Sequence, residues 1–182
     1  MEKSISMPVG VIVRKTPGIT RWAKWAWRIT DVIPNAGPAR WRELRREGEA
    51  VEYHAGTATL ELHRTDTEAY LVALSNNPPS VYAILRKSES PDREYDVHAV
   101  TASAYEAQDY GDAAEDMVEQ VPMPQSLINW VWDFVDKHHT DEEFVKRRRD
   151  RVKTDLVQEG IGDDRIRQIA DVYRAPSGKK SS

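Results

Sequence analysis

Residues 8–17, PVGVIVRKTP, decide the fold class of this 182-residue chain. Valine occupies every second position from Val9 to Val13, a period of two that is typical of a β-strand with one buried face. Pro8 and Pro17 bracket the stretch. The same alternation recurs over residues 24–30 and 58–63. These two-residue periods predict an antiparallel sheet.

Further strands are expected along the first two thirds of the chain. Residues 51–54, 81–86 and 95–103 are strand candidates, and residues 69–74 form a nearly continuous apolar run that also predicts a strand. The turn sequence Asn-Asn-Pro-Pro at 76–79 predicts a hairpin between two of them. About seven closely spaced strands over residues 7–122 favour a sandwich or partial barrel.

The hydrophobic period changes after Pro122. Apolar residues recur at steps of three and four between Leu127 and Val135, which predicts one amphipathic helix over residues 124–139. Pro124 suits the first turn of such a helix. We expect the apolar stripe to pack on the sheet, so the predicted fold class is α+β.

Tryptophan is abundant, with six residues against two phenylalanines. We expect Trp25, Trp27, Trp130 and Trp132 to form the core where the helix meets the sheet. The burial of Trp22 and Trp41 is less clear, and a tryptophan left exposed would be an interface anchor.

Three regions are predicted along the chain. Residues 1–139 form a β-rich globular domain with its closing helix. Residues 140–174 form a charged helical extension, which begins at a capping box made by Thr140 and Glu143. Residues 175–182, APSGKKSS, form a disordered tail.

Composition excludes several classes of protein. The chain has no cysteine, which rules out disulfides, zinc thiolate sites, iron–sulfur clusters and cysteine nucleophiles within it. Its mean hydropathy is -0.67, and its apolar runs are far shorter than the roughly 20 residues that a membrane span needs. The N-terminus shows no signal-peptide core. We therefore expect a cytoplasmic protein that does not bind membranes.

The charges are distributed unevenly. Residues 94–136 contain ten carboxylates and neither lysine nor arginine. A basic arm follows, formed by Lys146, Arg147, Arg148, Arg149 and Arg151. Both stretches are explained by solvated surfaces. Alternatively, the acidic face docks a basic partner or the chain's own tail, and the arm reaches a partner protein; nucleic acid is the weakest alternative, because the arm has no interleaved aromatic residues.

A dense polar and aromatic segment follows the strand predicted at 95–103. Its members are Tyr105, Glu106, Gln108, Asp109 and Tyr110. Loops at strand ends often carry function, and tyrosines beside carboxylates suit a protein interface or ligand site. A structural turn, with both tyrosines in the core, explains the same residues.

A second candidate site rests on Glu61 and His63, which point to one face of their predicted strand. With His54 and His98 they could line a pocket for acid–base chemistry or metal binding, although an exposed polar face explains the pair equally well. Their spacing matches no metal motif, and the chain has neither a phosphate-binding glycine loop nor a Gly-x-Ser-x-Gly elbow. We therefore assign no metal site and no cofactor, and an enzyme is the weaker hypothesis.

Several segments carry a family resemblance: MPVGVIVRK (7–15), WAWR (25–28), HAGT (54–57), LELHR (60–64), EAY (68–70), PPSVY (78–82), VTASAYEAQDY (100–110), VPMP (121–124) and FVKR (144–147). Together they resemble a bacterial domain family of unknown function that is often encoded beside molybdenum-dependent formate dehydrogenase genes. The resemblance covers about residues 7–151, and TASAYEAQDY is its most specific part. It implies a role in the assembly, maturation or operation of that enzyme, and it supplies no catalytic residues.

The function expected from these features is that of a cytoplasmic accessory protein. Its expected partner is a protein, with formate dehydrogenase subunits or maturation factors as the candidates that the resemblance implies. The alternative is a small-ligand-binding protein or enzyme that uses Glu61 and His63. A third hypothesis, nucleic-acid binding through residues 141–182, predicts steep salt dependence.

Overall fold

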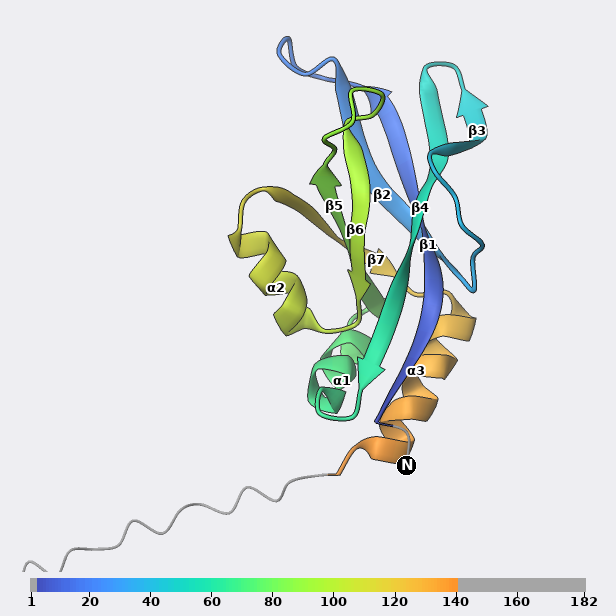
Figure 1. The fold of residues 1–182 in the computed structure, drawn as a ribbon, viewed down its shortest axis with the longest axis vertical. Coiled ribbons are helices and arrows are strands. Elements are labelled where there is room, and N and C mark those ends of the chain that lie inside the picture. Colours follow the sequence, from blue (N-terminus) through green and yellow to red (C-terminus); the bar gives the residue numbers. More distant parts are fainter. Residues whose placement is uncertain (1–2, 141–182) are drawn as a thin grey trace, which may run out of the picture. The chain divides into compact units, whose positions relative to one another are not determined.

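The computed structural model describes residues 3–140, which form seven strands and three helices (Figure 1). In chain order these are β1 (Ser4–Pro17), β2 (Trp25–Pro34), β3 (Arg42–Glu47), β4 (Ala50–His63), α1 (Thr67–Ser75), β5 (Ser80–Lys87), β6 (Tyr95–Thr101), α2 (Ala104–Asp112), β7 (Asp116–Pro122) and α3 (Gln125–His138). The predicted α+β class with antiparallel strands is confirmed.

The first sheet has four strands in the order β2-β1-β4-β3, all antiparallel to their neighbours. Its central strand β1 is buried on both faces between Val9 and Val13. Gly10 is required there, because a Cβ at this position would lie 2.5 Å from His54 Nε2 and 2.8 Å from the Ala36 Cβ. The loop that contains Ala36 thus covers the outer face of β1.

The second sheet has three antiparallel strands in the order β6-β5-β7. β4 lies beside β6, and β2 lies beside β7, so the two open sheets meet along both of these strand pairs. The Ile29 amide of β2 donates a 2.8 Å hydrogen bond to Glu119 Oε2 of β7. On the other side Gly56 of β4 allows the close approach of β6, because a Cβ there would lie 3.0 Å from Val97 Cγ2.

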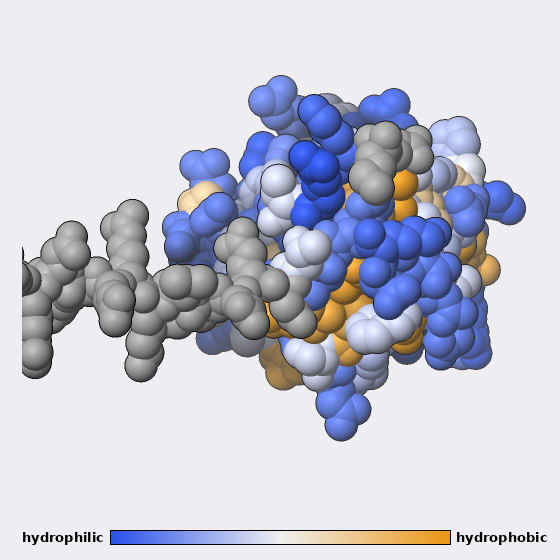
Figure 2. All heavy atoms as spheres, turned by 90° about the horizontal axis from the view of Figure 1, so that it is seen from below, coloured by the Kyte–Doolittle hydropathy of each residue, from blue (hydrophilic) through white to orange (hydrophobic). Residues whose placement is uncertain are grey.

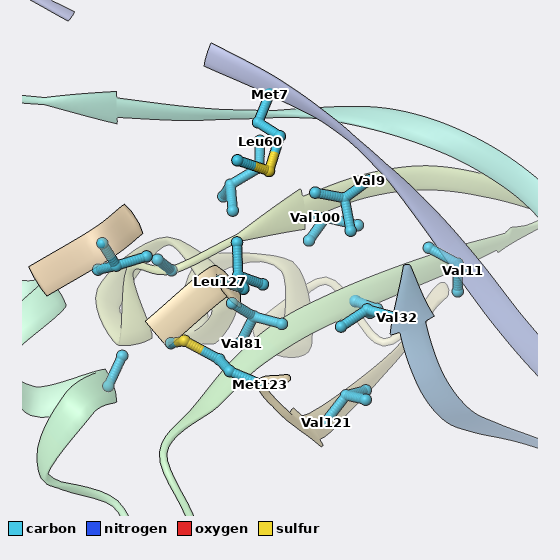
Figure 3. Packing of buried hydrophobic residues seen from close by; sticks show 14 of the residues in the cluster. Met7, Val9, Val11, Val32, Leu60, Val81, Val100, Val121, Met123 and Leu127 are labelled. Atoms are coloured by element: carbon cyan, nitrogen blue, oxygen red, sulfur yellow. The ribbon is translucent and has the colours of Figure 1, made fainter. Parts of the chain in front are cut away.

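The core lies between the sheets and α3. Leu127, Val131, Phe134 and Val135 are its buried residues on α3, so the predicted amphipathic stripe is confirmed. Figure 3 shows Leu127 beside side chains of the second sheet such as Val81, with residues of the first sheet across the core. Each buried leucine or phenylalanine contributes about 2–5 kcal/mol when compared with alanine.

The strand predicted at residues 69–74 is wrong, because this run belongs to helix α1. Ala69, Tyr70 and Ala73 are its buried apolar positions, a spacing that fits a helix packed on one side. The prediction failed because the run is apolar at nearly every position, so its periodicity could not separate a buried strand from a buried helix. The Asn76–Pro79 turn therefore joins a helix to a strand and does not make a hairpin.

Other elements also differ from the prediction. Strand β4 continues through Ala55 and Gly56, but its register against β1 shifts there: Val11 pairs with Gly56 and Ile12 with His54, which leaves Ala55 as a β-bulge. β3 was missed because all six of its residues are exposed and five are charged, so it carries no alternating pattern. Three helices, rather than one, accompany the sheets.

The tryptophans do not form the predicted core. Trp27 and Trp130 are half-buried at the edge of the hydrophobic cluster, and Trp132 is 53% exposed on α3. Trp27 contacts Trp41 and Tyr95. Trp25 and Trp27 lie at the start of β2, at the end of this strand that is remote from α3 (Figure 1).

The charged extension, the disordered tail and the basic arm lie outside the described residues. Within residues 3–140, no helix is long and apolar enough to cross a membrane.

Candidate functional site

The predicted site at residues 105–110 lies on helix α2 and not in a loop or turn. Ser103 is its N-cap, and its Oγ accepts a 3.2 Å hydrogen bond from the Glu106 amide. Glu106 in turn accepts a 2.6 Å hydrogen bond from Thr101 Oγ1. The Ser-x-x-Glu spacing of a capping box was therefore present in the sequence and marks where the helix begins.

Helix α2 turns its polar side chains toward different surroundings. Glu106 and Asp109 line an open cavity of about 250 Å³ together with Asp66 and Glu68 at the start of α1. Tyr105, which is 60% exposed, lies at the same cavity and is not a core residue. Carboxylates in the first turn are favourable at a helix N-terminus, so Glu68 and Glu106 also have a structural role.

The remaining two residues of this segment face elsewhere. Gln108 lines a separate depression against Tyr82 and Val118. Tyr110 packs edge-on against His98, with ring centroids 5.4 Å apart. The five residues of the predicted site therefore do not all line one cavity.

Glu61 and His63 lie on one exposed face of β4, with His63 Nε2 3.7 Å from Glu61 Oε2. Neither residue lines any of the described cavities. His54 is buried and hydrogen-bonded to Thr57. His98 is on β6 and packs against Tyr110 of α2. The described part of the chain does not bring the three histidines together.

A polar cavity of about 530 Å³ lies along β5 and β6, and charged side chains pair around it. A hydrogen bond from the Arg93 guanidinium holds the pKa of Asp96 below its usual range. The Arg86 guanidinium forms two 2.7 Å hydrogen bonds with Asp116 and lowers the pKa of that carboxyl in the same way. These charges compensate one another, which makes this cavity a weak candidate for a ligand.

A cluster of aromatic residues lies at the end of the sheets remote from α1 and α3, near the β1–β2 and β5–β6 loops (Figure 1). Trp41 is its centre, with ring centroids 5.4 Å from Trp27 and 5.6 Å from Tyr53, both edge-on. Tyr95 packs edge-on against Trp27 at 6.1 Å. Edge-to-face packing of this kind stabilises aromatic pairs beyond their buried area.

Hydrogen bonds fix both indoles. Trp27 Nε1 donates to Glu94 Oε2 at 2.7 Å, and Trp41 Nε1 donates to the Tyr95 carbonyl at 2.9 Å. The Trp41 amide also donates to the Ala55 carbonyl at 3.1 Å. Trp41 has a φ of 48°, in the left-handed region that a bulky side chain rarely adopts. The surrounding contacts therefore hold this ring against a local backbone cost.

The loop before Trp41 is tied to β4 through Thr57. Thr57 Oγ1 donates a 2.7 Å hydrogen bond to the Gly37 carbonyl. Because a hydroxyl has one proton, Thr57 accepts the 3.1 Å hydrogen bond that joins it to His54, and His54 Nε2 is the donor. This chain of two bonds positions the loop that leads into Trp41.

The rings surround a cavity of about 160 Å³, which we call the aromatic cavity; its lining residues are Lys15, Trp27, Trp41, Tyr53, Asp92 and Arg93. The Lys15 ammonium lies over two indoles, 4.1 Å from the Trp25 ring centroid and 5.1 Å from that of Trp27. Distances of this size give a cation–π attraction. The cavity thus combines aromatic walls with a cation at its rim.

The loop from β1 to β2 presents two apolar side chains to solvent; we call residues 18–24 the β1–β2 tip. Ile19 is 101% exposed and Trp22 is 94% exposed. The tip is closed by a 3.0 Å hydrogen bond from the Gly18 amide to the Lys24 carbonyl. Gly18 is required there, because a Cβ would overlap the Ala23 carbonyl oxygen.

Other exposed apolar side chains lie on the helices and on two strands, Ile33 on β2 and Leu44 on β3. Seen from the end that carries α1 and α3, apolar side chains show between hydrophilic ones (Figure 2). Val72 on α1 is 41% exposed and Trp132 on α3 is 53% exposed. Both are less exposed than the two residues of the β1–β2 tip.

The sequence reasoning missed the aromatic cavity and left the fate of Trp22 open. The signal for the cavity was the abundance of tryptophan, but its rings come from separate elements that only the fold brings together. The signal for the β1–β2 tip was the presence of two large apolar residues, Ile19 and Trp22, in the short segment between the first two strands.

Comparison with known proteins places the chain by family. No curated protein and no solved structure matches it. A family model described as "Protein of unknown function (DUF3305)" matches residues 8–148. This range includes all three described helices and every described strand, apart from the first residues of β1. The chain therefore belongs to the DUF3305 family.

Proposed function

We propose that this protein is an accessory protein that binds a partner protein through its β1–β2 tip. The observation that carries the proposal is the near-complete exposure of Ile19 and Trp22 on a closed, hydrogen-bonded turn. Large apolar side chains presented in this way are typical anchors of protein interfaces.

The energetics favour an anchor role. Burying one tryptophan side chain removes about 150–250 Å² from water, a gain of roughly 4–6 kcal/mol before the costs of association. Arg21 and Lys24 flank Trp22 and are exposed. The matching surface on the partner is therefore an apolar pocket bordered by carboxylates, since complementary charge orients the encounter.

The family resemblance suggests which partners to test first. Formate dehydrogenase subunits and their maturation factors are the candidates that it implies, and a cytoplasmic location would be consistent with that role. The choice of these partners rests on the family resemblance alone, whereas the choice of the binding surface rests on the exposure of Ile19 and Trp22.

The experiment is a pull-down with the tagged full chain from cells grown on formate. We expect the native protein to retain formate dehydrogenase subunits or maturation factors. Trp22→Ser should reduce their capture about 30-fold, the effect of losing an interface hot spot of about 2 kcal/mol. Trp132→Ser is the matched control, because it removes a second exposed tryptophan.

Two results would contradict the proposal. One is retention of the partner by Trp22→Ser together with its loss in Trp132→Ser, which would move the interface to α3. The other is the absence of these proteins from the native capture, which would remove the formate dehydrogenase assignment.

A further inference from the structure

We propose that the aromatic cavity binds a small planar ring that carries a negative charge, such as an aromatic carboxylate. This site is independent of the partner-binding role, because none of its lining residues belongs to the β1–β2 tip. The shape of the cavity, its walls and its charges all suit such a ring.

Shape and walls suit a single ring. The cavity has a volume of about 160 Å³, and a cavity of roughly 150 Å³ accommodates one benzene-sized ring. Trp27, Trp41 and Tyr53 supply aromatic walls that lie edge-on to one another. A planar guest can therefore stack on one ring while it meets the edge of the next.

The walls are fixed before any ligand arrives. Hydrogen bonds to Glu94 and to the Tyr95 carbonyl hold the indoles of Trp27 and Trp41. The contacts that keep Trp41 at a positive φ have the same effect. A pocket that is already formed avoids the cost of ordering its side chains on binding.

The charges favour an anionic guest. Arg93 pairs with Asp96, and the charge of Asp92 also acts on Arg93. Lys15 is half-buried and forms no ion pair within residues 3–140. Its ammonium is therefore the group available to a carboxylate.

A cationic guest is disfavoured for a related reason. The Lys15 ammonium already lies over the rings of Trp25 and Trp27, and Trp27 is one of the two indoles that line the cavity. A cationic guest would therefore be repelled by the Lys15 ammonium. A neutral ring would fill the space between the walls but would form no charge-assisted hydrogen bond with the ammonium.

The test is a titration of the full chain with three ligands of one shape: benzoate, benzamide and benzylamine. The readout is the indole N–H resonances in ¹H–¹⁵N spectra, with those of Trp27 and Trp41 assigned by substitution. We expect benzoate to shift both resonances saturably with a Kd of about 1 mM, which is usual for so few atoms. Benzamide and benzylamine should bind about tenfold more weakly or not at all, because they lack the charge-assisted bond.

Matched variants locate the site. Lys15→Met keeps the apolar stem and should weaken benzoate about tenfold or more. Lys24→Met is the control, because Lys24 lies 6.0 Å from the Trp25 ring centroid and does not line the cavity. Should Lys15→Met fail to fold by circular dichroism, Tyr53→Leu removes one wall and serves the same purpose.

The proposal is overturned if benzoate causes no saturable shift of these two resonances. Benzylamine binding as tightly as benzoate would also overturn it, as would equal effects of the Lys15 and Lys24 substitutions. None of these results bears on partner capture, so the two proposals fail separately.

Discussion

Replacing Thr57 with valine tests how the aromatic cavity is held together. Thr57 joins the Gly37 carbonyl, at 2.7 Å, to His54 Nε2, at 3.1 Å. Valine has the shape of threonine but neither bond. His54 is only 8% exposed, so its N–H would be left without a partner. An unsatisfied buried donor costs about 1–3 kcal/mol, and we expect the free energy of unfolding to fall by that amount.

The assay is urea denaturation followed by circular dichroism. The midpoint should fall while the slope against urea stays constant, as expected when stability changes and the surface exposed on unfolding does not. The Trp41 indole resonance should shift as well, because the loop before it loses its tie to β4. Thr59→Val is the matched control on the same strand, where the side chain is exposed; its effect should stay within about 0.5 kcal/mol.

The reasoning is refuted if Thr57→Val and Thr59→Val have the same effect on the midpoint. An unchanged Trp41 resonance in a destabilised Thr57→Val variant would refute the role assigned to the loop.

Three further predictions concern the core and its ion pairs. Leu127→Ala, at a fully buried position of α3, should lower the free energy of unfolding by about 2–5 kcal/mol in urea denaturation. Burial raises the pKa of Tyr70 to about 12, so the folded state keeps the proton more firmly than the unfolded chain. The corresponding stability, about 2–3 kcal/mol, is complete below pH 10 and is lost as pH rises toward 12; Tyr70→Phe should show no such alkaline loss. Arg86 lowers the pKa of Asp116, so this pair stabilises the fold above the ordinary carboxyl pKa and loses that effect as pH falls through the lowered value. Arg86→Met should flatten the acid limb of stability against pH.

The sequence predicted those elements whose pattern is local. Val9 to Val13 alternate, and β1 is a strand; the residues from Leu127 to Val135 recur at helical steps, and α3 packs on the sheets. Both patterns arise because one face of a single strand or helix packs against the core, which sets the spacing of its apolar residues. The same local reasoning missed α1, because its apolar run lacks a clear period, and β3, because all of its side chains face solvent.

The aromatic cavity could not be predicted from local pattern. Trp27 lies on β2, Tyr53 on β4 and Tyr95 on β6, and Trp41 directly precedes β3. Only the pairing of strands and the meeting of β4 with β6 bring these rings together. Local spacing carries no information about such contacts.

The prediction that residues 105–110 form a loop or turn was wrong for the opposite reason. Its chemistry drew attention to a loop, whereas Ser103 and Glu106 already mark the start of a helix. A helix spreads its side chains around an axis, so consecutive polar residues face different surroundings. That is why Gln108 and Asp109 line different cavities.

The central claim, that the β1–β2 tip is a partner-binding surface, is tested most directly by hydroxyl-radical footprinting. The native chain is labelled alone and in complex with formate dehydrogenase subunits or maturation factors. The account predicts that labelling of Trp22 falls in the complex to the level of a buried residue, while labelling of Trp132 stays unchanged. Equal labelling of Trp22 in the free and bound protein would contradict it.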